Sequence, residues 1–156
     1  MRDEKVAGVY KVKNKIYIQE YALTDSTDKI DGSPVCLRVD ENIEIIGKTL
    51  LEVLDKSKRH IPDKSKVTPV WIAAGFRGWK PFAKQSYSMG AILEGDLLTL
   101  NPSALETDHH SFVPIDDPDP DIVTRDLSHE NVGKSVLECL ARCKNVYIDV
   151  FGLFKD

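Results

Sequence analysis

IGKTLLEVLDKSK at residues 46–58 and VGKSVLECLARCK at residues 132–144 are two versions of one sequence. Six of the thirteen aligned positions are identical and most of the others exchange similar side chains, so chance explains the match poorly. At about 100° per residue, the apolar positions of each copy fall on one arc about 160° wide, with the charged positions opposite. The repeat therefore predicts two equivalent amphipathic helices, one in each of two similar structural units.

Both copies contain the Gly-Lys-Ser/Thr tripeptide of a phosphate-binding loop, but the rest of that motif is absent. The motif requires an earlier Gly, where this chain has Asn42 and Ser128, and an apolar strand running into the loop. A helical projection instead places Gly47 and Gly133 within the apolar arcs. Because Gly inside a helix costs about 1 kcal/mol relative to Ala, its presence in both copies predicts close backbone contact, and we expect the contacted surface to be a sheet.

The first unit covers about residues 5–60. Runs rich in β-branched and aromatic residues favour strands, and here they occur at residues 6–12, 16–23 and 34–39. The short polar sequence between the first two runs predicts a tight hairpin. A helix follows, with Asp40 or Asn42 as its N-cap. The predicted order is strand, strand, strand, helix.

The second unit covers about residues 66–154 and has a similar predicted order. Extended segments are expected at residues 67–74, 79–87 and 89–93. Glu94-Gly95-Asp96 predicts a hairpin turn, and Ser128 is the expected N-cap of the second helix. Alternating apolar residues predict a final strand at residues 146–154.

A chain of 156 residues is long enough for a domain that buries about two thirds of its unfolded surface. We therefore expect residues 1–156 to form a single α+β domain. It would contain two units, each an antiparallel β-meander followed by one helix, with the helices packed on the sheet. The patterns leave open whether the strands form one continuous sheet or two packed sheets, as in whirly-type single-strand DNA-binding folds.

The chain has an odd number of cysteines, Cys36, Cys139 and Cys143, and no C-x-x-C motif. We expect such thiols to be small core hydrophobes in a reducing compartment. The N-terminal sequence has no signal-peptide core, and no segment approaches the length of a membrane-spanning helix. These features predict a cytoplasmic protein with no membrane partner.

Charge is distributed unevenly along the chain. Residues 56–88 hold eight Lys or Arg and one Asp, whereas residues 94–130 hold ten Asp or Glu and one Arg. Within the acidic part, residues 101–122 contain four of the eight prolines, which disfavours regular structure and predicts a surface excursion. Two interpretations stay open. Folding could interleave the two segments so that their fields cancel, or the excursion could present an acidic face to a basic partner.

Aromatic and cationic side chains alternate in one short segment. Arg77, Trp79, Lys80 and Phe82 together are typical of a surface that stacks single-stranded bases. The same rings would also suit a core, with the cations pointing outward. The net charge of −4 disfavours a nucleic-acid groove, which needs an extended positive surface. Nucleic-acid binding is therefore the alternative hypothesis.

His109 and His110 lie among several aspartates of the excursion, and this cluster resembles a metal site. Its spacing matches neither the HExxH motif nor a calcium-binding loop. The chain also lacks the G-x-S-x-G elbow of many serine hydrolases. We expect no metal, no cofactor, no small-molecule substrate and no catalytic residue, and a hydrolase that uses His109 and His110 is the remoter alternative.

Three segments together resemble a known family: IGKTLLEVLDKSKR at residues 46–59, WKPFAKQSYSMGAILEGDLLTLNPSALE at residues 79–106 and DLSHENVGKSVLECLARC at residues 126–143. In this order they resemble bacterial contact-dependent growth inhibition immunity proteins, over about residues 40–144. The resemblance implies a cytosolic protein that binds and neutralises the C-terminal toxin domain of a cognate effector. Such toxins are often nucleases with basic surfaces. Because partner binding defines the family, no catalytic residues carry over.

An acidic excursion suits a basic toxin surface, and its prolines limit the entropy lost on docking. The residues predicted to pair with Lys and Arg of the toxin are Glu106, Asp108, Asp116, Asp117, Asp119 and Asp121. A second binding mode is β-augmentation, in which a toxin hairpin pairs with an edge strand. In that mode the acidic loop would mainly set the association rate.

Overall fold

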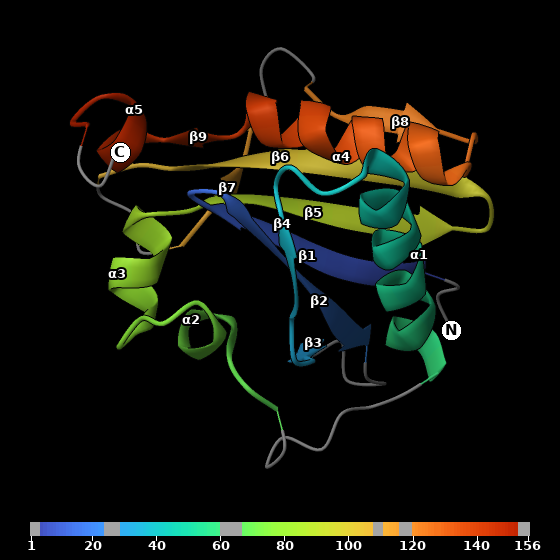
Figure 1. The fold of residues 1–156 in the computed structure, drawn as a ribbon, viewed down its shortest axis with the longest axis horizontal. Coiled ribbons are helices and arrows are strands. Elements are labelled where there is room, and N and C mark those ends of the chain that lie inside the picture. The colour runs from blue at the N-terminus through green and yellow to red at the C-terminus, as the bar shows by residue number, and fades with distance from the viewer. Residues whose placement is uncertain (1–3, 24–28, 60–66, 108–110, 116–119, 153–156) are drawn as a thin grey trace.

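The computed structural model describes residues 4–23, 29–59, 67–107, 111–115 and 120–152, which form nine strands and five helices (Figure 1). The strands are β1 (Glu4–Val12), β2 (Lys15–Leu23), β3 (Lys29–Asp31), β4 (Val35–Arg38), β5 (Tyr87–Glu94), β6 (Leu97–Leu105), β7 (Val113–Pro114), β8 (Ile122–Thr124) and β9 (Lys144–Asn145). The helices are α1 (Ile43–Arg59), α2 (Val70–Ala73), α3 (Trp79–Lys84), α4 (His129–Arg142) and α5 (Val146–Asp149). The α+β class predicted from the sequence is confirmed.

All of the described strands belong to one sheet, which answers the question of one sheet or two. The central order is β3-β2-β1-β5-β6-β7; β4 also pairs with β2, and β8 and β9 also pair with β6. Neighbouring strands are antiparallel except for β6 and β9, which run parallel. The long strands β2, β1, β5 and β6 form the middle of the sheet, and the short strands lie outside them.

The repeat extends from the helices to the strands. β1 and β5 pair antiparallel in the middle of the sheet, and Gly8 is the register partner of Gly90. On each side of this pair the chain returns through a two-residue turn, since Val12 pairs with Lys15 and Glu94 pairs with Leu97. Each returning strand pairs with a short strand, β4 or β8, that leads to a long helix. The two units are therefore related by an approximate twofold axis between β1 and β5.

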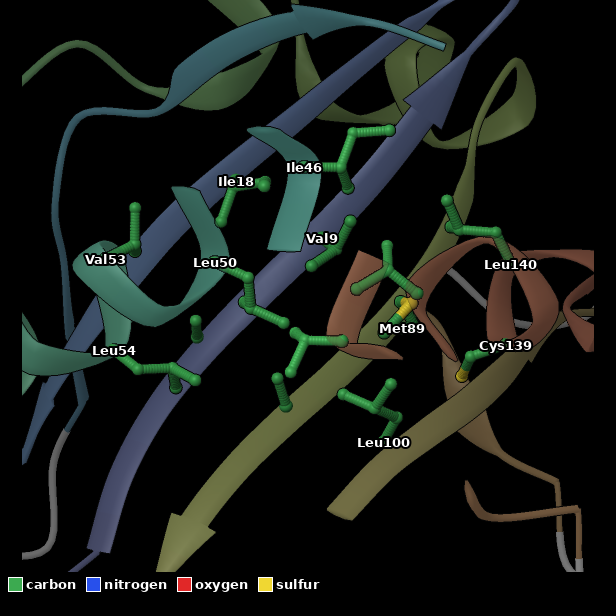
Figure 2. Packing of buried hydrophobic residues seen from close by; sticks show 14 of the residues in the cluster. Val9, Ile18, Ile46, Leu50, Val53, Leu54, Met89, Leu100, Cys139 and Leu140 are labelled. Carbon is green, nitrogen blue, oxygen red and sulfur yellow. The ribbon is translucent and has the colours of Figure 1, made fainter. Parts of the chain in front are cut away.

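One face of the sheet, called here the first face, is covered by α1 and α4. Strand residues alternate between faces, and Val9, Ile18, Met89 and Leu100 point toward the helices, as Figure 2 shows. The helices contribute fully buried apolar side chains to the same cluster: Ile46, Leu50, Leu54, Val132, Val136 and Cys139. The apolar arcs predicted from the repeat therefore do cover the sheet.

The two repeated glycines, however, contact the other helix rather than the sheet. A Cβ atom on Gly47 would collide with the carbonyl oxygen of His129 and lie 2.8 Å from the amide nitrogen of Gly133. At the equivalent position of the other helix, a Cβ on Gly133 would collide with the carbonyl oxygen of Ile43. Close backbone contact was expected at these positions, but the sheet as the contacted surface was wrong. The glycines let two helices cross backbone to backbone above the sheet.

Both long helices begin at the predicted type of N-cap. The Asn42 side-chain oxygen accepts a hydrogen bond from the amide of Glu44 at 2.9 Å, whereas Asp40 pairs with Arg38. Ser128 Oγ accepts a hydrogen bond from the amide of Asn131 at 3.3 Å. These caps satisfy amide groups that have no partner within the first turn.

The opposite side of the sheet, called here the second face, is covered by α2 and α3 at one end. Tyr10 and Tyr17, near the β1–β2 turn, pack with Val70 of α2 and the fully buried Phe82 of α3. Trp79 packs against this cluster and is half-buried. Figure 1 shows both short helices together, away from α1 and α4. The second face therefore has a small aromatic core of its own.

The strands expected at residues 67–74 and 79–87 were wrong for most of their length. α2 begins directly after Pro69, whose fixed φ suits the start of a helix, and Gly75 with φ of 87° ends that segment. α3 occupies residues 79–84, and β5 starts only at Tyr87. The β-branched and aromatic residues that favoured strands here are instead needed to fill the aromatic core, so packing overrides local propensity.

The expected final strand at residues 146–154 was also wrong. The chain forms β9, then α5, and residues 153–156 lie outside the described residues. Asn145 caps α5 through a hydrogen bond from the amide of Tyr147 at 3.0 Å. The side-chain amide nitrogen of Asn145 also donates hydrogen bonds to the backbone carbonyls of Ala83 and Ser86. One buried side chain thereby fixes the C-terminal segment against α3.

The three thiols lie in different environments. Cys36 is exposed on β4, so its expected place in the core was wrong, because it lies on the second face beyond the cover of α2 and α3. Cys139 and Cys143 are buried, as predicted. Burial raises the pKa of Cys139 to about 12 and that of Cys143 to about 11. These two thiols stay neutral and unreactive at ordinary pH.

Replacing Gly47 with Ala tests the helix crossing. Ala is the better helix former by about 1 kcal/mol, but its methyl group would force α1 away from α4. We expect Gly47→Ala to lower the free energy of unfolding by about 2 kcal/mol in urea titrations. The solvent-facing variant Lys48→Ala should change it by less than about 0.5 kcal/mol. A Gly47→Ala variant more stable than the wild type would contradict the close crossing.

The buried thiols predict a loss of stability at high pH. An unfolded Cys ionises near pH 8.5, whereas the folded thiols stay protonated to higher pH, so their contribution is complete below about pH 8.5 and disappears as the pH passes their raised values. We expect about 2 kcal/mol less stability per thiol at pH 10 than at pH 7, measured by urea unfolding under reducing conditions. Cys139→Ala should show a visibly smaller loss. An unchanged pH dependence in that variant would contradict the assignment.

Candidate partner-binding surface

The acidic excursion is shorter than the sequence predicted. Residues 101–105 continue β6, and β7 and β8 return to pair with it. Pro102 lies inside β6 opposite Met89, and its carbonyl accepts a hydrogen bond from the amide of Ile115. The missing N–H is tolerated because β6 is bordered there only by short outer segments. The prolines therefore do not exclude strands, and the excursion proper runs from residue 106 to residue 121.

The described parts of the excursion are fixed to the body of the protein. Tyr147 of α5 donates a hydrogen bond to the carbonyl of Thr107 at 3.4 Å. The Phe112 ring packs edge-on against Tyr10 and Trp79, with ring centroids 6.4 and 6.2 Å away. At its end, Arg142 of α4 donates to the carbonyl of Pro120 at 2.8 Å. These contacts hold the base of the loop at several points.

Two of the six predicted partner-binding acids lie in the described part of the chain. Glu106 is exposed just after β6, and Asp121 is half-buried just before β8. Both already take part in interactions within the protein, so they are not free carboxylates. The others lie outside the described residues, as do the two histidines: Asp108, Asp116, Asp117, Asp119, His109 and His110.

Folding brings a basic side chain of residues 56–88 to the base of the acidic excursion. Lys84 lies over the ring of Tyr147, with its ammonium nitrogen 5.1 Å from the ring centroid, and Tyr147 contacts Thr107. Such a cation–π contact stabilises by about 0.5–1 kcal/mol at an exposed site. Lys84 therefore lies against the tyrosine that holds the start of the excursion.

The alternative nucleic-acid surface does not have the geometry of a stacking platform. Phe82 is fully buried, and Trp79 packs against Tyr10 and Phe82 with centroids 6.2 and 5.5 Å away. Arg77 and Lys80 are exposed. A base can stack only on an accessible ring, so this segment is better described as a core anchor with outward cations.

Sequence reasoning missed a polar network at the same end of the molecule. Asp149 of α5 accepts hydrogen bonds from the Tyr87 hydroxyl and from the amide of Asn145. Burial and the hydrogen bond to Asp149 raise the pKa of Tyr87 well above its usual value. The available signal was Asn145 itself, because an Asn before a short apolar run favours an N-cap as well as a strand end. The network gives α5 a fixed position beside the acidic loop.

The outer strands give a partner hairpin little to pair with. β4 has four residues on one side of the sheet, and β7 and β8 have two and three on the other. Short edge strands are a common protection against strand addition. Within the described residues, β-augmentation would therefore have few unpaired backbone groups to use.

Metal and membrane sites find no support in the described part of the chain. No group of three or more His, Cys, Asp or Glu side chains there has the arrangement of a metal site. Among the same residues, none of the helices has the length and apolar character needed to cross a membrane.

Comparisons with known proteins show that the fold also occurs in solved structures. No family model and no curated protein sequence matches the chain. The fold is similar to a protein of unknown function from Neisseria meningitidis, with a TM-score of 0.70 and 20% identity, covering 92% of this chain and 98% of that one. It is also similar to a chain of the CdiA-CT/CdiI toxin and immunity complex from Yersinia pseudotuberculosis, with a TM-score of 0.67 and 13% identity, covering 90% and 98%. At these identities the likeness shows a shared fold over nearly the whole chain.

Proposed function

We propose that this protein is an immunity protein that binds and neutralises the C-terminal toxin domain of a cognate contact-dependent growth inhibition effector. The observation that carries the proposal is the fold shared with a chain of the CdiA-CT/CdiI toxin and immunity complex over 90% of this chain. The resemblance of residues 40–144 to immunity proteins of this kind points to the same function. Both observations favour a cytoplasmic protein whose activity is to occupy a partner.

Neutralisation by binding requires no catalytic group in this chain. The buried thiols of Cys139 and Cys143 have raised pKa values, which make them poor nucleophiles. A non-enzymatic inhibitor acts by covering its toxin, so its essential properties are a stable scaffold and a complementary surface. The first face, which α1 and α4 cover, provides the stable scaffold. The second face and the acidic excursion remain for the complementary surface.

The acidic excursion is our proposed contact with a basic toxin surface. Glu106, Asp108, Asp116, Asp117, Asp119 and Asp121 would pair with Lys and Arg of the toxin. The anchors at Thr107, Phe112 and Pro120 support this proposal because a loop with a fixed base loses less entropy on docking. Dense negative charge would also accelerate association with a basic partner.

Growth rescue tests the function itself. If the proposal is correct, a neighbouring upstream reading frame encodes the cognate effector, whose C-terminal domain can then be expressed from an inducible promoter. We expect co-expression of this protein to restore growth and the two proteins to co-purify. A toxin domain that kills equally with and without this protein would reject the proposal.

Charge reversal tests the proposed contact. Asp116→Lys, Asp117→Lys and Asp119→Lys in one variant should slow association with the toxin domain at least tenfold at low salt and flatten its salt dependence. The matched control reverses Glu44, Glu52 and Glu130 on the exposed helix surfaces, with the same change in net charge. Surface plasmon resonance separates the rates. Equal association rates for the two variants would remove the excursion from the interface.

The aromatic segment gives a test of the alternative function. Trp79→Ala removes a ring from the aromatic core and should lower the free energy of unfolding by about 2–3 kcal/mol. We expect Lys80→Ala, an exposed neighbour, to leave stability unchanged, and neither variant to alter retention of single-stranded DNA in gels. Salt-sensitive DNA retention by the wild type that Trp79→Ala abolishes would favour the nucleic-acid hypothesis instead.

A further inference from the structure

The approximate twofold symmetry fails at one place on the second face. Gly8 and Gly90 are register partners next to the symmetry axis. The space in front of Gly8 is filled by the Tyr21 ring, since a Cβ there would lie 2.7 Å from Tyr21 Cζ. In front of Gly90 the space is open, because among the described residues only the Asn101 side-chain oxygen, 3.8 Å away, would approach a Cβ. We call this opening the Gly90 notch.

The cause of the notch is a sequence difference between the two units. In the first hairpin Tyr21 of β2 pairs with Val6, and the equivalent place in the second hairpin is held by Ser103, which follows Pro102 opposite Met89. The Ser103 hydroxyl donates a hydrogen bond to the carbonyl of Ser88 and is too short to reach Gly90. The second unit therefore has the same glycine without the ring that covers it.

A row of apolar and polar side chains borders the notch and crosses three strands. Ile92, Thr99 and Val123 are aligned on β5, β6 and β8 by their register and point to the second face. Val123 is 57% exposed, which is high for a β-branched residue on a strand. The side chains of Thr99 and Asn101 have no hydrogen-bond partner among the described residues, which leaves polar groups available beside the apolar ones.

Negative charge lies at the end of the same surface. Glu4 and Glu94 are register partners on β1 and β5 and lie on the second face. Like charges directly opposite each other on a sheet are destabilising. Neither carboxylate forms an ion pair with any other described residue. A cation from a partner placed between them would relieve this repulsion.

We propose that the Gly90 notch receives an aromatic side chain of the toxin domain, while a neighbouring Lys or Arg of the toxin meets Glu4 and Glu94. The chain itself provides the template, because the Tyr21 ring fills the equivalent space at Gly8 with its hydroxyl 2.9 Å from that of Tyr10. This inference rests on the proposed function and names the surface that the toxin contacts. Val123 is two residues after Asp121, so the notch and the end of the acidic loop can belong to one interface.

Filling the notch tests the inference without weakening the fold. Gly90 has no left-handed backbone conformation, and a Cβ there meets only an ordinary contact. Val is favoured in strands where Gly is not, so Gly90→Val should have an equal or higher urea midpoint. We expect it to bind the toxin domain at least tenfold more weakly by isothermal titration calorimetry. Gly78→Val, at another glycine where a Cβ meets only an ordinary contact, is the control and should bind like the wild type.

The charged part has its own pair of variants. Glu94→Lys should also weaken binding at least tenfold, whereas Glu52→Lys, an equal change of charge on the outer surface of α1, should not. If the wild type binds the toxin domain and Gly90→Val binds equally well, the notch is not in the interface, although the proposed function stands. If the wild type itself fails to bind or to rescue growth, the proposed function fails together with the notch.

Discussion

The backbone contact between Gly47 and Gly133 is the constraint on which the rest of the structure depends. A side chain at either position would meet a carbonyl oxygen of the other helix, so only glycine lets α1 and α4 approach so closely. This close crossing lets the apolar arcs of both helices reach the same face of the sheet. The loss of helix propensity at two positions, about 1 kcal/mol each, is offset by the fully buried side chains that the crossing allows, among them Leu50 and Val136.

The equivalent helices α1 and α4 cover the first face together, so the two units are similar there. The structural differences between the units lie elsewhere. The first unit covers its central glycine with Tyr21, and the second leaves Gly90 open. The second unit also carries the acidic excursion between β6 and β8, with Phe112 packed into the aromatic core. The two units share the hairpin, the short strand and the long helix, whereas the unshared features lie on the second face and at the end of β6. A partner-binding function would be expected to use those features.

Much of the architecture could be predicted from the sequence because it depends on periodicity and turn chemistry. The amphipathic arcs of α1 and α4, the caps at Asn42 and Ser128 and the turn at Gly95 are local signals. The predictions failed where β-branched and aromatic residues, which usually favour strands, lie on short helices instead. Val70 and Phe82 favoured strands but lie on short helices, because the aromatic core needed them.

The candidate site was harder to predict than the fold. The acidic excursion is a compositional feature and was visible at once, whereas the Gly90 notch depends on a register partner and on a ring that only one unit has. Neither the register partner nor the position of that ring can be found by counting charges or motifs. In the same way, Asn145 acts through carbonyls of Ala83 and Ser86, some sixty residues away along the chain. Such long-range contacts become visible only once the strand order is known.

Nuclear magnetic resonance would test the account most directly, through amide chemical shifts of the labelled chain during titration with the toxin domain proposed as its partner. If the helix pair is scaffold and the second face binds the partner, the largest shift changes should occur at Gly90, Thr99, Asn101 and Val123 and in the acidic excursion. The amides of α1 and α4 should change little. Changes confined to the outer surfaces of these helices, with none at Gly90 or Val123, would contradict the account.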